Sequence, residues 1–195
     1  NVAIVLGTIC GCIVLGIGPS LQAGHHMAKL RHQQKSMPFF KTFCRYYKKV
    51  FKSANLIMVP VEFIYILPLG LILKQNGADL SRGFAIVLLI SLVLVVMTLL
   101  TLFPMYEFYQ LKTNQYFVSA LRFISYNPIG CLLALLATAL CVYLITLFPG
   151  VTLFIFGVAV YLNMGLYLRF FEQNEEKVQK TQQEEKKSLK GALEK

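Results

Sequence analysis

Charged residues are scarce in this sequence, and acidic residues are scarcer still. Only 14% of the 195 residues are charged, and 9 Asp and Glu stand against 19 Lys and Arg, which gives a formal net charge of +10. The hydrophobic fraction is 56% and the mean hydropathy is +0.61. These values lie outside the usual range of soluble domains and indicate a membrane protein. The length fits one helical membrane domain, which we expect over residues 1–171, followed by a charged polar tail over residues 172–195.

The sequence also lacks the motifs that carry catalytic chemistry. It contains no P-loop, no HExxH, no nucleophile elbow and no cluster of acids that could hold a metal ion. The five cysteines lack the paired spacings, in water-accessible loops, that a disulfide or metal framework needs. We therefore expect a protein that is not an enzyme and has no cofactor and no metal site, with an intramembrane enzyme as the alternative.

Five apolar segments have the length and composition of membrane spans, which take about 20 residues in a helix. The first is short because it starts at Asn1, without the charged region and cleavage site of a signal peptide, so we expect a trimmed or partial chain. Gly18-Pro19 is expected to end the first span, and Pro149-Gly150 alone separates the last two, which predicts a tight helical hairpin. The sequence therefore predicts an all-α, polytopic membrane protein with spans at about residues 2–17, 54–73, 83–104, 129–148 and 151–168.

The orientation of these spans follows from the basic residues, because loops rich in Lys and Arg stay on the cytoplasmic side. Eight Lys and Arg and no acid lie between the first and second spans, and seven more follow the fifth. Lys74 and Arg82 are the two basic residues between the second and third spans. We expect a multi-pass protein of the bacterial cytoplasmic membrane, with its N-terminus outside and its C-terminus in the cytoplasm.

The segment MPFFKTFCRYYKKVFKSAN, residues 37–55, is basic and aromatic and contains no acid. If residues 39–52 are helical, apolar and basic side chains separate onto two faces, which predicts an amphipathic helix at the cytoplasmic membrane surface. Nucleic-acid binding would place aromatic rings and cations in one groove, so we do not expect it. Two uses stay open: holding anionic lipid headgroups, or contacting a partner protein. The apolar face is Phe40, Phe43, Cys44, Tyr47, Val50 and Phe51, and the basic face is Lys41, Arg45, Lys48 and Lys52.

A few polar and small residues interrupt the apolar segments. Glu62 is the ionisable residue expected deep within a span, where a carboxylate is costly and is a functional candidate, and Asn163 is a milder case that could join two helices. Small residues at helix-packing intervals are Gly7 and Gly11 in the first span and Gly157 and Gly165 in the fifth. The three histidines, His25, His26 and His32, are expected to titrate at the surface rather than bind a metal.

The tail from Glu172 to Lys195 balances six Glu against six Lys and has almost no apolar positions. Pairs such as Glu176 and Lys180 could support a solvated helix that continues the fifth span. A frayed or disordered end is the favoured prediction.

The order of these features resembles a known family. An apolar first helix starting at an Asn, then GPSLQAGHHMAKL, then a basic FFxxFxxxxKxxFKxAN run into the second span is similar to the YesL family of bacterial membrane proteins, a domain of unknown function. Members often carry an acid just before the Phe-Phe pair, where this chain has Met37-Pro38. The resemblance implies an accessory role beside carbohydrate ABC importers and their sensor kinases.

Three functions are therefore weighed. The first is a non-catalytic accessory or scaffolding subunit that packs against ABC permease subunits of an oligosaccharide importer. The second is an independent carrier that uses Glu62 and needs to form a homo-oligomer, because five spans do not divide into paired repeats. The third is a membrane signalling partner of a sugar-sensing histidine kinase, which rests on the resemblance and the charged tail.

Overall fold

The computed structural model is helical, and it describes all residues except 1–3, 8–13, 62–81, 110, 112 and 194–195. No strand occurs in the described part, so the all-α prediction is confirmed there. The helices with given bounds are α2 (Val14–His32), α3 (Phe39–Val61), α5 (Arg82–Phe108), α6 (Thr113–Tyr126), α7 (Pro128–Leu147), the short 3-10 helix η2 (Pro149–Val151) and α8 (Thr152–Leu193).

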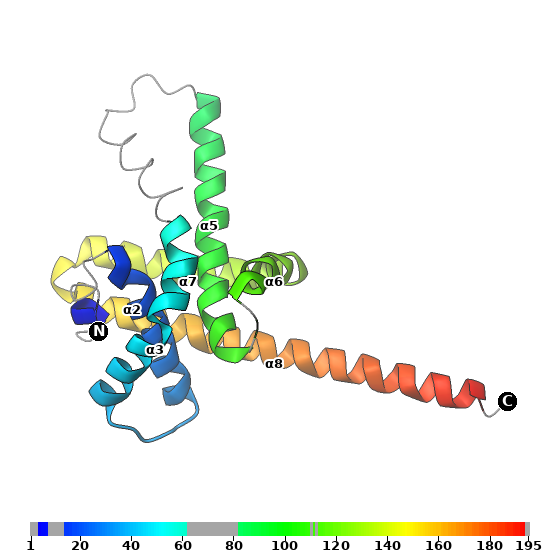
Figure 1. Cartoon of the computed structure of the whole chain (residues 1–195). Helices are drawn as coiled ribbons and strands as arrows, with labels where there is room; N and C mark the ends of the chain where they lie inside the picture. The colour runs from blue at the N-terminus through cyan, green and yellow to red at the C-terminus, as the bar shows by residue number, and fades with distance from the viewer. Residues whose placement is uncertain (1–3, 8–13, 62–81, 110, 112, 194–195) are drawn as a thin grey trace.

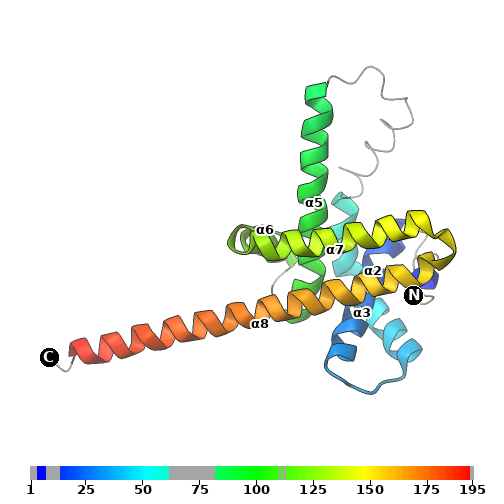
Figure 2. The ribbon, with the colours of Figure 1, turned by 180° about the vertical axis from the view of Figure 1, so that it is seen from behind.

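Figure 1 shows α5 standing upright while α7 and α8 run across it, and the reverse view in Figure 2 shows the same crossing. α7 and α8 lie side by side as a hairpin through η2, as the Pro149-Gly150 pair predicts. α2 packs against α3, α5 and α8. The described helices therefore meet at a crossing point instead of forming a parallel bundle.

Among the described residues, three helical segments are long and apolar enough to cross a membrane: Leu89–Phe108, Pro128–Leu147 and Phe154–Glu184. They correspond to the third, fourth and fifth predicted spans. Half of the first predicted span, and residues 62–73 of the second, lie outside the described residues, so the total of five is not confirmed. The length and composition of these three candidate spans indicate a membrane protein.

The helix does not end at Gly18-Pro19, where the sequence predicts the end of the first span, because α2 continues through both residues to His32. A Cβ atom placed on Gly18 would lie 3.0 Å from the Met58 Cβ and 3.2 Å from the Ala54 carbonyl oxygen. Gly18 therefore lies where the backbone of α3 closely approaches α2, and the missing side chain allows this packing.

The core of the crossing point is aromatic and lies between α5, α6, α7 and α8. Tyr167 and Phe171 of α8 are fully buried against Phe123 of α6, and the Tyr167 hydroxyl lies 2.8 Å from Thr101 Oγ1 of α5. This packing holds the α7–α8 hairpin against α5.

Residues 39–52 are helical as predicted, but α3 has no break before Ala54 and runs on to Val61. Part of the predicted apolar face of α3 faces the protein interior: Phe43 and Val50 are buried and Tyr47 is half-buried. Phe40 departs from this pattern, with 62% of its surface exposed. The apolar face of this segment packs on α2, so α2 covers part of the surface that the sequence assigned to the membrane interface.

The favoured prediction of a disordered tail is wrong, because α8 continues as one helix from Thr152 to Leu193. Residues 172–184 are exposed, and in both views this part of α8 extends away from the other helices. The mixed Glu and Lys composition supports a solvated helix through pairs four residues apart.

Candidate functional site

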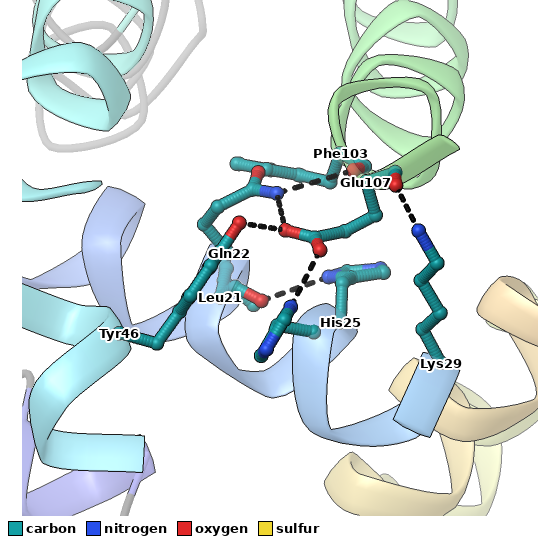
Figure 3. Close-up of polar contacts among 8 residues, drawn as sticks. Leu21, Gln22, His25, Lys29, Tyr46, Phe103 and Glu107 are labelled. Atoms are coloured by element: carbon teal, nitrogen blue, oxygen red, sulfur yellow. Dashed lines mark hydrogen bonds and ion pairs between the residues drawn. The ribbon is translucent and has the colours of Figure 1, made fainter. Parts of the chain in front are cut away.

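Seven polar side chains from four helices meet where α2 crosses the end of α5, and we name them the junction cluster. Figure 3 shows Gln22 of α2 and Tyr46 of α3 turned toward the carboxyl group of Glu107 on α5, with Lys29 reaching its main-chain oxygen and His25 bonded to the Leu21 carbonyl oxygen. The cluster consists of Gln22, His25, His26, Lys29, Tyr46, Glu107 and Asn163.

The α2 members lie on one face of that helix because their positions, 22, 25, 26 and 29, follow helical spacing. Ala23, Met27 and Ala28 are buried around them. The polar residues therefore point into the protein and need partners from other helices, since a buried polar group without a hydrogen bond is costly.

Glu107 is the centre of the cluster. Its Oε1 accepts hydrogen bonds from Gln22 Nε2 at 2.5 Å and from the Tyr46 hydroxyl at 2.6 Å. Its Oε2 lies 2.8 Å from His26 Nδ1, and Lys29 Nζ donates to the Glu107 main-chain oxygen. The Glu107 side chain is only 3% exposed, so these contacts replace water almost completely.

Tyr46 connects α3 to this carboxyl group. Its ring stacks on the His26 ring with centroids 3.7 Å apart. Burial, with the nearby Glu107 charge as a second cause, raises the pKa of the Tyr46 hydroxyl, so it remains a hydrogen-bond donor at neutral pH.

His25 is buried, so the prediction of a surface histidine is wrong at this position. Its Nδ1 donates to the Leu21 carbonyl oxygen at 2.8 Å, and its Nε2 accepts from Asn163 Nδ2 at 3.2 Å. Burial lowers the pKa of His25 to about 4, against smaller opposing effects of the Leu21 carbonyl and Glu107. Both contacts fit a neutral ring that carries its proton on Nδ1.

Asn163 repairs a defect in α5. Pro104 has no N–H, so the carbonyl oxygen of Leu100, four residues earlier, has no intrahelical donor. Asn163 Nδ2 of α8 donates to this oxygen at 3.0 Å. The amide therefore links α8 to both α5 and α2, which fits the interhelical role expected for it, while its Oδ1 has no hydrogen-bond partner among the described residues.

The glycines predicted to pack helices lie in different settings. A Cβ atom on Gly165 would lie 2.7 Å from the His32 ring, which stacks on Tyr161 with centroids 4.1 Å apart. A Cβ atom on Gly7 would lie 2.8 Å from the Ser20 hydroxyl oxygen. Gly157 lines a groove described below, and Gly11 lies outside the described residues.

The remaining predicted residues do not join the junction cluster. Glu62, the carboxylate expected within a span, lies outside the described residues. The basic residues Lys41, Arg45, Lys48 and Lys52 are all exposed on α3, and Phe51 is half-buried.

Sequence reasoning missed Glu107 and the buried role of the α2 residues. Glu107 follows the third predicted span and pairs with residues 81 to 85 positions away, which no local spacing shows. The available signal was the polar stripe of α2, whose helical spacing in an otherwise apolar segment required an internal partner.

The cluster can fix helices in place. The Glu107 carboxyl group lies within hydrogen-bond reach of the His26 imidazole and the Tyr46 phenol, and the Lys29 amine bonds the main-chain oxygen of the same residue, so the cluster ties α2 and α3 to the end of α5. No group of three or more His, Cys, Asp or Glu residues placed to hold a metal ion occurs in the part of the chain that the structure describes.

Comparison with known families bears on the first part of the chain. Residues 1–69 match the family described as "Protein of unknown function, DUF624", which is the YesL family of bacterial membrane proteins. This match confirms the resemblance to the YesL family. It includes α2 and α3, and so the α2 stripe and Tyr46, whereas Glu107 and Asn163 lie outside the matched residues. No curated protein and no solved structure matches the chain.

Proposed function

We propose that this YesL-type chain is a non-catalytic accessory or scaffolding subunit of a bacterial carbohydrate ABC importer. It resides in the cytoplasmic membrane and packs against the permease subunits of an oligosaccharide system. The association of the family with such importers is the starting point, and the surface of α3 is the observation that carries the proposal.

The exposed face of α3 is a regular row of cations. Lys41, Arg45, Lys48 and Lys52 follow one another at intervals of three or four residues and are all exposed. None of them forms an ion pair with another described residue. Such a row supports contact with an acidic protein surface, because unpaired cations complement negative charge and speed the encounter.

The opposite side of α3 is held by contacts with α2 and α5. Phe43 and Val50 are buried, α3 packs along α2, and the Tyr46 hydroxyl donates to Glu107 of α5. The row of cations is therefore presented from a rigid support, which lowers the entropy cost of binding. Phe40, at the start of the row, supplies an exposed aromatic ring of the kind that anchors interfaces.

Apolar side chains on α7 supply a surface for helix contacts within the membrane. Ile129, Leu136, Leu140 and Tyr143 are each more than half exposed in the isolated chain. Lipid or a neighbouring helix must cover them, and permease spans suit this surface because helix packing in membranes depends on close van der Waals contact.

Co-purification from native membranes tests the proposal. The tagged chain is extracted in mild detergent, and the proteins retained with it are quantified by mass spectrometry. The comparison uses a charge-reversed α3 variant, Lys41→Glu with Lys48→Glu, and a control, Lys177→Glu with Lys180→Glu, which reverses two exposed lysines on the tail.

Permease or ATPase subunits are expected with the native chain and the tail control, and at least tenfold less with the α3 variant. Oligosaccharide uptake is expected to fall in the same order. A chain that purifies alone, or equal retention by the two variants, would contradict the proposal.

The continuous α8 favours signalling to a sensor kinase as a second function. One helix joins an apolar segment to the exposed tail. We therefore expect a displacement where α8 crosses α5 to move residues 172–184. Truncation before Glu172 is expected to change kinase output and leave uptake intact, and unchanged output would rule this function out.

A further inference from the structure

A groove of about 970 Å³ lies beside the α2–α3 connection, away from the junction cluster. Its walls come from the C-terminal end of α2, the connection itself, the start of α3 and the start of α8. The volume is at the upper end of the range for small-molecule pockets, about 300–1,000 Å³, so it exceeds what a headgroup alone would fill.

The groove is polar at one side and apolar on the other. Arg31 and Lys35 contribute its exposed cations, and no Asp or Glu is among its lining residues. Neither cation forms an ion pair with another described residue. Phe39 and Tyr161 give the apolar part its exposed surface, and the buried side chains of Met27 and Phe43 lie beneath it.

The apolar part continues onto the surface of α8. Gly157 and Tyr161 line the groove, and Phe154, Val158 and Tyr161 are exposed at helical spacing on the same side of α8. This side belongs to the segment Phe154–Glu184, which has the composition of a membrane span. The groove therefore opens onto a surface that suits hydrocarbon.

We propose that this groove binds one anionic phospholipid, with its phosphate between Arg31 and Lys35 and an acyl chain along Phe39 and Tyr161. The two cations complement the phosphate, and the apolar walls complement the chain. A free phosphate or a sugar leaves the apolar walls exposed, and a zwitterionic lipid leaves the cations incompletely neutralised. The lipid stabilises the start of α8 against the α2–α3 connection.

Native mass spectrometry and lipid titration in nanodiscs test this proposal. The intact chain is compared with Arg31→Gln plus Lys35→Gln, and with a control that removes two exposed charges outside the groove and outside α3, Lys177→Gln plus Lys180→Gln. The probes are phosphatidylglycerol, phosphatidylcholine and glycerol 3-phosphate. A second variant, Tyr161→Ala, removes part of the apolar wall and leaves both cations in place.

The expected result is one phosphatidylglycerol retained by the native chain and the control, and about thirtyfold weaker retention in the Arg31 and Lys35 variant. Tyr161→Ala is expected to weaken the binding of phosphatidylglycerol but not the binding of glycerol 3-phosphate. Equal binding of phosphatidylcholine, equal loss in the control, or glycerol 3-phosphate binding as tightly as the lipid would overturn the proposal. So would a groove that retains no lipid because a segment of this chain or of a partner covers it.

Discussion

Asn163→Ala is expected to destabilise the junction of α5, α8 and α2 by about 2–3 kcal/mol. The change removes the donor to the Leu100 carbonyl oxygen, at 3.0 Å, and the donor to His25 Nε2, at 3.2 Å. A buried acceptor left without its partner costs about 1–3 kcal/mol, whereas interhelical hydrogen bonds in membrane proteins average about 0.6 kcal/mol. Loss of the unpartnered Asn163 Oδ1 offsets part of this cost.

A second substitution, Pro104→Ala, isolates the contribution of the hydrogen bond from Asn163 to the Leu100 carbonyl oxygen. This second change restores an N–H at position 104, which can donate to the Leu100 carbonyl oxygen within α5. Asn163→Ala should then cost about 1 kcal/mol less in the Pro104→Ala background than in the native chain. The free energy of unfolding is measured in mixed micelles, with circular dichroism as the signal, for the native chain, the two single variants and the double variant.

A control cycle pairs Pro104→Ala with Thr138→Ala, whose hydroxyl donates to the Ala134 carbonyl oxygen of its own helix at 2.9 Å. This pair shares no hydrogen-bond partner and should be additive within about 0.5 kcal/mol. Additivity of Asn163→Ala with Pro104→Ala as well would refute the assignment of Asn163 as the substitute donor of α5.

The remaining predictions concern the titration and packing around the cluster. The pKa of His25 is about 4 in the folded chain and 6.5 ordinarily, so its neutral form contributes stability above pH 6.5 that is lost as the pH falls toward 4, on the order of 3 kcal/mol in all. His25→Gln should therefore reduce the dependence of the melting temperature on pH between pH 7 and 4.5. An unchanged pH dependence would contradict this. Glu107→Gln should cost about 2–4 kcal/mol and Tyr46→Phe about 1 kcal/mol in chemical unfolding, and the reverse order would count against Glu107 as the centre. Gly165→Ala should displace the His32 ring and cost about 1–3 kcal/mol, whereas a stable variant with unchanged near-ultraviolet circular dichroism would show that the ring adjusts freely.

The sequence predicts correctly those helices that are determined by residues close together in the chain. The charge-free run of α5 and the Pro149-Gly150 hairpin are properties of neighbouring residues, so hydropathy and turn chemistry predict them. Gly18-Pro19 is also a local pattern, and it predicts the end of a helix. In the structure the helix continues, and Gly18 instead allows close packing of α2 on α3. The tail was misjudged because charge composition alone does not distinguish a solvated helix from disorder.

The junction cluster could not be predicted from spacing, because its partners lie on four helices. Asn163 could be recognised as an interhelical amide, but its acceptor depends on which turn of α5 lies opposite and on the N–H that Pro104 lacks. Glu107 follows the predicted end of its span and gives no sign of burial until α2 is placed against it. Tertiary contact therefore determines the chemistry here, whereas hydropathy determines the helices.

The most direct test of the accessory-subunit proposal uses Cys44, which is exposed on α3, whereas Cys131 and Cys141 are buried. With Cys10 and Cys12 replaced by Ser, a photoreactive maleimide on Cys44 samples the surroundings of the cation row in native membranes. A control carries the probe at Thr181→Cys with Cys44→Ser. We predict a cross-link from Cys44 to a permease or ATPase subunit of a carbohydrate importer, absent from the control. Cross-links from Cys44 to lipid alone, or to the same proteins as the control, would contradict the proposed function.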